Sequence, residues 1–221
     1  MGLARLSLRH EDQARFWKLC GSGTGHGFTP RPNWGVWSIL AVWPDLATAE
    51  ARVATSPVWQ RWRARAQESW TVYMTPISAR GTWAGANPFV PDSAPAIAAP
   101  ATPSGPLAAL TRATVKPSRA LRFWNRVPGI SDVIGTDPNV AFKIGIGEVP
   151  LLHQVTFSIW PDTASMAAFA RGDGPHGRAI RAVREGNWFA EELYARFQLL
   201  GSEGTWQGRD PLAGLTLPLA A

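Results

Sequence analysis

The stretch Leu151–Gly177, LLHQVTFSIWPDTASMAAFARGDGPHG, decides the fold of this 221-residue chain. It alternates up to a Trp-Pro-Asp corner, which indicates a strand, and continues in a helical pattern that breaks at Gly174-Pro175, just before His176. The earlier stretch Val36–Gln60, VWSILAVWPDLATAEARVATSPVWQ, repeats this order, with valines where the later copy has His153 and His176. The sequence therefore predicts one strand–helix unit that occurs twice, with histidines in the second copy only.

The flanking segments extend this repeat to two halves. For the first half we expect, in order, a strand, a helix, a strand, an interrupted helix and a strand, over Leu3–Leu8, Glu11–Leu19, Trp34–Trp43, Leu46–Gln67 and Trp70–Ser78. For the second half we expect strands over Leu107–Val115, Val140–Ile146, Leu152–Ile159 and Leu193–Leu199, with helices capped by Ser118 and Asp162. The second half is then β-α-β-β-α-β, the ferredoxin-like arrangement, and the repeat predicts the same arrangement for the first half.

A lone four-stranded sheet with helices on one face leaves its other face bare, and two such halves bury those faces together. The predicted fold class is therefore α+β, with tandem ferredoxin-like repeats forming an α+β barrel; two separate domains on a string are the alternative. Six prolines in residues 86–106 predict a semi-extended linker. The expected division is a first half at 1–85, the linker, a second half with the functional site at 107–210, and an apolar tail at 211–221.

The composition indicates a globular protein, with 45% hydrophobic and 17% charged residues. The net charge of +6 fits a solvated basic surface or weak attraction to an anionic membrane surface, and no nucleic-acid motif is present. No signal-like segment or 18-residue apolar run occurs, so we expect a cytoplasmic protein, peripheral at the inner face of a bacterial membrane. A homo-oligomer is compatible with this composition. The single Cys20 excludes a disulfide within one chain.

His176 is the first candidate for chemistry. It opens the second part of a helix and shares a face with Ala179, Ile180 and Val183, so its imidazole is expected to point toward the sheet. Neighbouring glycines leave space where the first half has Val58 and Trp59. An imidazole above an apolar space suits an axial ligand of haem iron. A buried histidine with a backbone partner explains the spacing equally well.

His153 is the second candidate. It opens a strand and shares a face with Val155, Phe157 and Ile159. It is either a satisfied group at a strand end or, beside a cofactor, a second ligand or proton donor. His10 and His26 are expected in surface and loop positions. No two histidines have a close metal-ligand spacing.

Several longer motifs together resemble the spheroidene monooxygenase family, the acyclic carotenoid 2-ketolases of purple bacteria. They are GTGHGFTPRPN (Gly23–Asn33), SILAVWPD (Ser38–Asp45), DPNVAFKIGIGEVPLLHQVTFSIWPD (Asp137–Asp162) and GPHGRAIRAVREGNWFAEELYARF (Gly174–Phe197). The likeness spans nearly the whole chain outside the linker and the tail.

This resemblance implies a haem-dependent monooxygenase that introduces a keto group at C-2 of an acyclic carotenoid, using O₂ and reduced ferredoxin. It implies haem b with His176 as the iron ligand, Ile180 and Phe157 beside the cofactor, and His153 as a catalytic proton donor. The alternatives are a haem enzyme of other chemistry, such as aldoxime dehydration or peroxidase action, and a non-catalytic pigment or lipid carrier on the same barrel.

Overall fold

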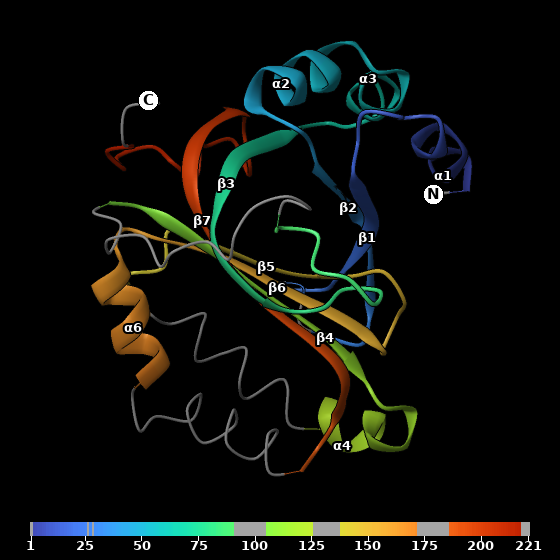
Figure 1. Ribbon diagram of the computed structural model, residues 1–221, viewed down its shortest axis with the longest axis vertical. Coiled ribbons are helices and arrows are strands. Elements are labelled where there is room, and N and C mark those ends of the chain that lie inside the picture. Colours follow the sequence, from blue (N-terminus) through green and yellow to red (C-terminus); the bar gives the residue numbers. More distant parts are fainter. Residues whose placement is uncertain are drawn as a thin grey trace.

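The computed structural model describes residues 2–25, 27, 29–90, 105–125, 138–171 and 186–217. Its centre is one antiparallel sheet of seven strands in the order β2-β1-β5-β6-β4-β7-β3, which curls on itself (Figure 1). The strands are β1 (Phe16–Gly23), β2 (Pro32–Val42), β3 (Trp70–Gly81), β4 (Leu107–Val115), β5 (Phe142–Gly147), β6 (His153–Trp160) and β7 (Phe189–Gly204). The helices are α1 (Gly2–Arg9), α2 (Leu46–Thr55), α3 (Pro57–Arg63), α4 (Ala120–Trp124), which follows the 3₁₀ turn Pro117–Arg119, and α6 (Thr163–Arg171).

The predicted α+β class is confirmed, and the second half has the ferredoxin-like order of elements. The second half runs β4, α4, β5, β6, α6, β7, with its strands in the order β5-β6-β4-β7. The two halves share the sheet, because β1 pairs with β5 at Gly21 and Gly147, and β3 pairs with β7 along its whole length. This edge-to-edge pairing excludes two separate domains on a string.

The opening of the chain was predicted wrongly. Leu3–Leu8 is not a strand but lies in α1, where Ala4 and Leu8 are buried and Leu6 is exposed. The spacing of four residues between Ala4 and Leu8 places both on one helical face, which packs against Val53, Val58 and Trp59. The first half therefore begins with a helix instead of a strand.

The predicted helix Glu11–Leu19 is also wrong, because β1 begins at Phe16. Phe16 and Cys20 pack into the main core, whereas Trp17 and Leu19 pack under the helices of the first half. A strand that is buried on both faces shows a continuous apolar run, which periodicity does not distinguish from a helix. Glu11 caps no helix; its carboxylate accepts hydrogen bonds from Arg52 and Ser56, both at 2.6 Å.

The sheet has an inner face and an outer face. The inner face holds the main core, to which β6 contributes Val155, Phe157 and Ile159. The outer face of the first half is covered by α1, α2 and α3, and α6 packs on the outer face of the second half through Met166 against Trp160 (Figure 1). The helices α1, α2, α3 and α6 therefore cover the outer face of the sheet, and the inner face is left for the main core.

The two Trp-Pro-Asp corners fix the starts of α2 and α6. Asp45 accepts a hydrogen bond from the Thr48 backbone at 2.7 Å, and Asp162 accepts one from Ser165 at 2.7 Å. These bonds satisfy free N–H groups of the first helical turn, as predicted for Asp162. The cap predicted at Ser118 is wrong, because Ser118 lies inside the 3₁₀ turn and α4 begins without a side-chain cap. No segment of the described residues forms a helix with the length and apolar character needed to cross a bilayer.

Candidate functional site

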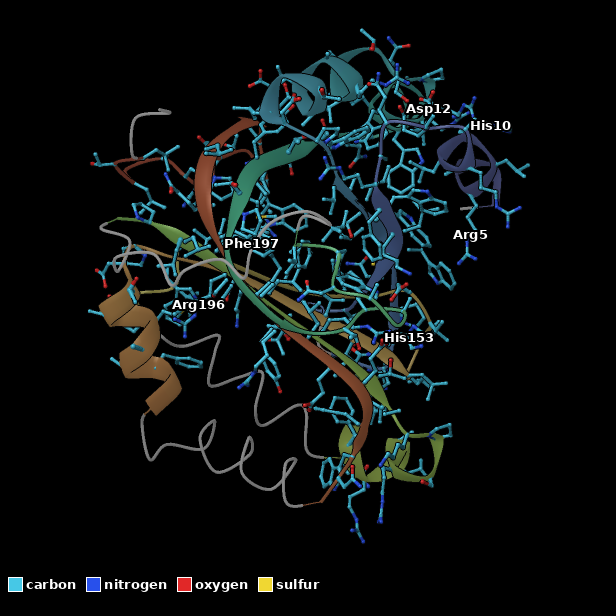
Figure 2. All side chains as sticks on the ribbon, in the orientation of Figure 1. Arg5, His10, Asp12, His153, Arg196 and Phe197 are labelled. Atoms are coloured by element: carbon cyan, nitrogen blue, oxygen red, sulfur yellow. The ribbon has the colours of Figure 1, made fainter. Side chains whose placement is uncertain are left out.

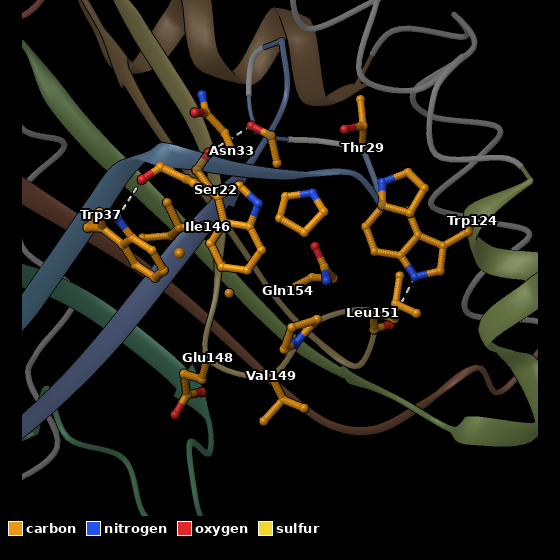
Figure 3. A pocket seen from close by; sticks show the side chains of 18 residues that line it. Ser22, Thr29, Asn33, Trp37, Trp124, Ile146, Glu148, Val149, Leu151 and Gln154 are labelled. Carbon is orange, nitrogen blue, oxygen red and sulfur yellow. Dashed lines mark hydrogen bonds between the residues drawn. The ribbon is translucent and has the colours of Figure 1, made fainter. Parts of the chain in front are cut away.

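A pocket of about 260 Å³ lies where β1, β2 and the β5–β6 hairpin meet α4 (Figure 3). Its walls come from the end of β1, Gly27, Thr29 and Pro30, the start of β2, the turn 147–151, Gln154 and Trp124. Gln154 points to the outer face of the sheet, since its neighbours Val155 and Phe157 alternate from the inner face. The pocket thus lies between the outer face of the sheet and α4.

Three tryptophans give the pocket its aromatic wall. Trp37 lies on one side and Trp124 on the other, with Gln154 between them (Figure 3). The indole of Trp124 donates a hydrogen bond to the Leu151 carbonyl at 2.9 Å, and that of Trp37 donates to the Trp34 carbonyl at 2.8 Å. These bonds satisfy the indole N–H groups and leave the ring faces for apolar contact.

Gly27 lies in one wall of the pocket, where the backbone passes close to β5. Its φ of +89° lies in the left-handed region, and a Cβ atom there would collide with the backbone of Gly145 in β5. Only glycine allows this approach. Ser22 in β1 also holds β5 close, because its hydroxyl donates a hydrogen bond to the Gly145 carbonyl at 2.8 Å.

A cluster of charged side chains lies on the inner side of the sheet, directly behind the pocket. Its centre is Glu148, which also lines the pocket and whose side chain is 12% exposed. The Glu148 carboxylate accepts a hydrogen bond from the Trp83 indole at 2.7 Å and lies 3.1 Å from Lys18 Nζ. It also lies 3.7 Å from Arg112 Nη2 and 3.5 Å from His153 Nδ1. In Figure 3 this carboxylate is turned away from Gln154.

Arg112 extends the cluster to β7. Its side chain is 2% exposed, pairs with Glu191 and lies over the Trp83 ring. Burial would raise the pKa of Glu191, but hydrogen bonds from the Gly85 backbone and the Thr82 hydroxyl, together with the charge of Arg112, lower that pKa to about 2. Glu191 is therefore the ionised partner that keeps the buried guanidinium compensated.

Cys20 lies beside this cluster as a buried thiol. Burial raises its pKa to about 12, and the negative charge of Glu148 contributes in the same direction. The thiol is therefore neutral at physiological pH and is no nucleophile. No three His, Cys, Asp or Glu side chains of the described residues are grouped so that they could hold a metal ion.

His153 lies in the charged cluster and not in the pocket. Its Nδ1 is buried without a hydrogen-bond partner and lies within ion-pair distance of Glu148 only. Figure 2 shows His153 near the β5–β6 turn, far from the exposed His10 beside α1. Phe157 is buried in the main core against Phe142, with ring centroids 6.2 Å apart.

The other predicted site residues, His176 and Ile180, lie outside the described residues, as does His26. Among the described residues the pocket has no imidazole in its wall, and the nearest one, His153, lies on the inner face. The described residues therefore do not form a haem site by themselves. The apolar space predicted near His176 has a filled counterpart in the first half, where Val58 and Trp59 are buried under α1.

Reasoning from the sequence missed Glu148, Arg112 and Trp124. Arg112 could have been found, because it alternates in phase with Leu110 on the inner face of a strand, where an unpaired charge is costly. Glu148 gave no local signal, since its partners come from β1, β4 and β6.

Comparison with known proteins agrees with the resemblance of the motifs. The spheroidene monooxygenase of Rhodobacter capsulatus is 59% identical over 98% of this chain and 88% of its own length. That of Cereibacter sphaeroides is 59% identical over 94% of this chain and 63% of its own length, and that of Rubrivivax gelatinosus is 39% identical over 90% and 74%. No family-wide sequence profile matches the chain.

Solved structures overlap only loosely. A structure titled putative monooxygenase, from Fusobacterium nucleatum, aligns over 93% of this chain and 81% of its own. The identity is 10% and the TM-score is 0.43, too low to assign a function. The assignment rests on the sequence relatives, whose identity extends over both halves of the chain. This chain belongs to the spheroidene monooxygenase family and is a monooxygenase.

Proposed function

We propose that the enzyme oxidises the end of an acyclic carotenoid, forming a 2-keto group through a hydroxylated intermediate. The observation that carries this proposal is the aromatic pocket between sheet and helix, together with relatives named spheroidene monooxygenase. A volume of about 260 Å³ is below the range of pockets that enclose a whole drug-sized ligand. A pocket of this volume suits one end of a long chain, and the rest of the chain would pass over the mouth of the pocket.

The residues of the pocket match an apolar chain end. The faces of Trp37 and Trp124 offer flat apolar contact to a conjugated chain. Gln154, between them, supplies a polar group that would hydrogen-bond an oxygen atom introduced at that end. The pocket would thus hold the hydroxylated intermediate for a second oxidation.

Each oxidation consumes one O₂, two electrons and two protons. One oxygen atom enters the substrate and the other leaves as water, and a second round at the same carbon gives a hydrated ketone that loses water. The proposed electron donor is reduced ferredoxin. The proposed proton donor is His153, as the family resemblance implies; its Nδ1 lies 3.5 Å from Glu148 on the inner face of the sheet, behind the pocket.

The proposed cofactor is haem b, with His176 as its ligand and Ile180 and Phe157 as its neighbours. This part rests on the family resemblance, because the described residues do not form the site. Haem would supply the activation of O₂; the described residues bind the substrate, exclude water and hold the proton.

A visible spectrum with a pyridine haemochrome assay on the purified protein tests the cofactor. We expect a Soret band that is lost in His176→Ala and kept in His153→Ala, whereas turnover of carotenoid is lost in both. Haem bound to the His176 variant and absent from the His153 variant would reverse the two roles. A metal-free, colourless protein that binds carotenoid without turnover would favour a carrier.

A further inference from the structure

Most of the exposed large apolar side chains among the described residues gather around the mouth of the pocket. Six large apolar side chains are exposed among the described residues, and five of them form this group, which we call the rim: Trp34, Trp37, Leu121, Val149 and Leu151. Trp34 is 74% exposed and Leu121 is 85% exposed. The sixth, Leu6, lies on α1 and does not line the pocket.

The rim is continuous although its residues come from three segments. Trp34, Trp37, Val149 and Leu151 line the pocket directly. Leu121 stands one helical turn before Trp124, whose indole binds the Leu151 carbonyl. The patch therefore combines the start of β2, the β5–β6 turn and α4 into one surface.

Positive charge accompanies these apolar side chains. The segments 31–37 and 116–125, which carry Trp34, Trp37 and Leu121, contain four basic residues and no acidic one: Arg31, Lys116, Arg119 and Arg122. None of the three arginines forms an ion pair with another described residue. Among the described residues that line the pocket, the one acid is Glu148, which is turned inward and pairs with Lys18.

Exposed tryptophan and leucine beside unpaired arginine is the composition of a surface that rests in the interface of an anionic bilayer. Tryptophan is favoured at the level of the lipid headgroups, and each basic residue near an anionic leaflet adds attraction. An acidic protein partner would explain the arginines but not the highly exposed Leu121 and Trp34. Lipid explains both.

We propose that the rim docks the enzyme onto an anionic phospholipid bilayer, with the mouth of the pocket against the membrane. In that orientation an apolar chain dissolved in the bilayer would enter the pocket without crossing water. The identity of that chain rests on the proposed function, but the docking itself does not, and it is measured without turnover.

The test is co-sedimentation of the full chain with vesicles of phosphatidylcholine alone or mixed with phosphatidylglycerol. We expect binding that increases with the phosphatidylglycerol fraction and falls as salt is raised. The double variant Leu121→Ala/Arg122→Gln should lower the partition coefficient on mixed vesicles about tenfold or more. Light scattering and thermal unfolding of each variant show whether assembly and folding are kept.

The chain offers a matched control on α1, where Arg5 and Leu6 are likewise adjacent and exposed. The variant Arg5→Gln/Leu6→Ala removes the same side-chain types away from the pocket and should bind vesicles like the unaltered protein. An equal loss in both double variants, or no vesicle binding by the unaltered protein, overturns the proposal. The proposal is also overturned if the unaltered protein is a dimer and Leu121→Ala/Arg122→Gln is a monomer, because the rim would then be a contact between two copies. It is likewise overturned if this variant still binds vesicles but no longer binds reduced ferredoxin.

Discussion

Removal of the Glu148 carboxylate is the perturbation that probes the structure most sharply. Glu148→Ala takes the acceptor from the Trp83 indole and the counter-charge from Lys18, and it leaves Arg112 with Glu191 alone. Removing one member of a buried charge pair costs about 3–5 kcal/mol. Because Arg112 keeps its second partner and Lys18 is partly exposed, we expect the lower end, about 3 kcal/mol.

The variant Glu148→Gln removes the negative charge of Glu148 but keeps the size of its side chain. The amide still accepts the hydrogen bond of Trp83 but provides no negative charge for Lys18, so we expect a smaller loss, about 1–2 kcal/mol. The assay is urea unfolding followed by tryptophan fluorescence, with slopes compared to confirm that the same surface is exposed. In a thermal scan, the alanine variant should unfold about 6–12 °C lower, since 1 kcal/mol corresponds to about 2–4 °C at this chain length.

Glu203 is the matched control. It pairs with Arg63 on the surface, where its side chain is 49% exposed, and an exposed pair contributes at most about 1 kcal/mol. If Glu148→Ala and Glu203→Ala lower the free energy of unfolding equally, the inner cluster is not the compensated, buried network described above.

Three further predictions follow from single residues. Cys20, with its pKa raised to about 12, should resist alkylation by iodoacetamide at pH 8 in the folded protein and react after unfolding, as mass spectrometry would report; fast native alkylation would contradict its burial. The folded pKa of Glu191 is lowered from 4.5 to about 2, so its contribution to stability is complete above pH 4.5 and is lost as pH falls toward 2; unfolding measured against pH should show this loss, and Glu191→Gln should flatten it. Gly27→Ala, which collides with the backbone of Gly145, should lower the free energy of unfolding by more than about 3 kcal/mol, whereas Gly25→Ala, with nothing within 4 Å, should cost about 1 kcal/mol from its positive φ alone; equal costs would refute the close approach at Gly27.

The repeat was predictable because its signals are local. The two Trp-Pro-Asp corners encode a strand end and a helix cap within three residues, so Asp45 and Asp162 could be assigned from the sequence. The start of the chain was not predictable in the same way. Phe16–Cys20 is buried on both faces, and the spacing of Ala4 and Leu8 allows a helix as well as a strand.

The candidate site was only partly predictable, for a related reason. A resemblance of motifs led to the family and singled out His153, which lies in the charged cluster. The charged cluster depends on tertiary structure, because Lys18, Arg112, Glu148 and Glu191 come from β1, β4, a turn and β7. No spacing in the sequence relates such residues, and their grouping appears only when the two halves share one sheet.

The central claim, that this chain is a monooxygenase acting on an acyclic carotenoid, is tested most directly with isotopic oxygen. Purified enzyme, reduced ferredoxin and an acyclic carotenoid in vesicles are incubated under ¹⁸O₂, and the products are analysed by mass spectrometry. We expect a hydroxylated product that carries one ¹⁸O atom and forms before the keto product. A product whose hydroxyl oxygen comes from water, or an unchanged carotenoid with enzyme that retains its cofactor, would contradict it.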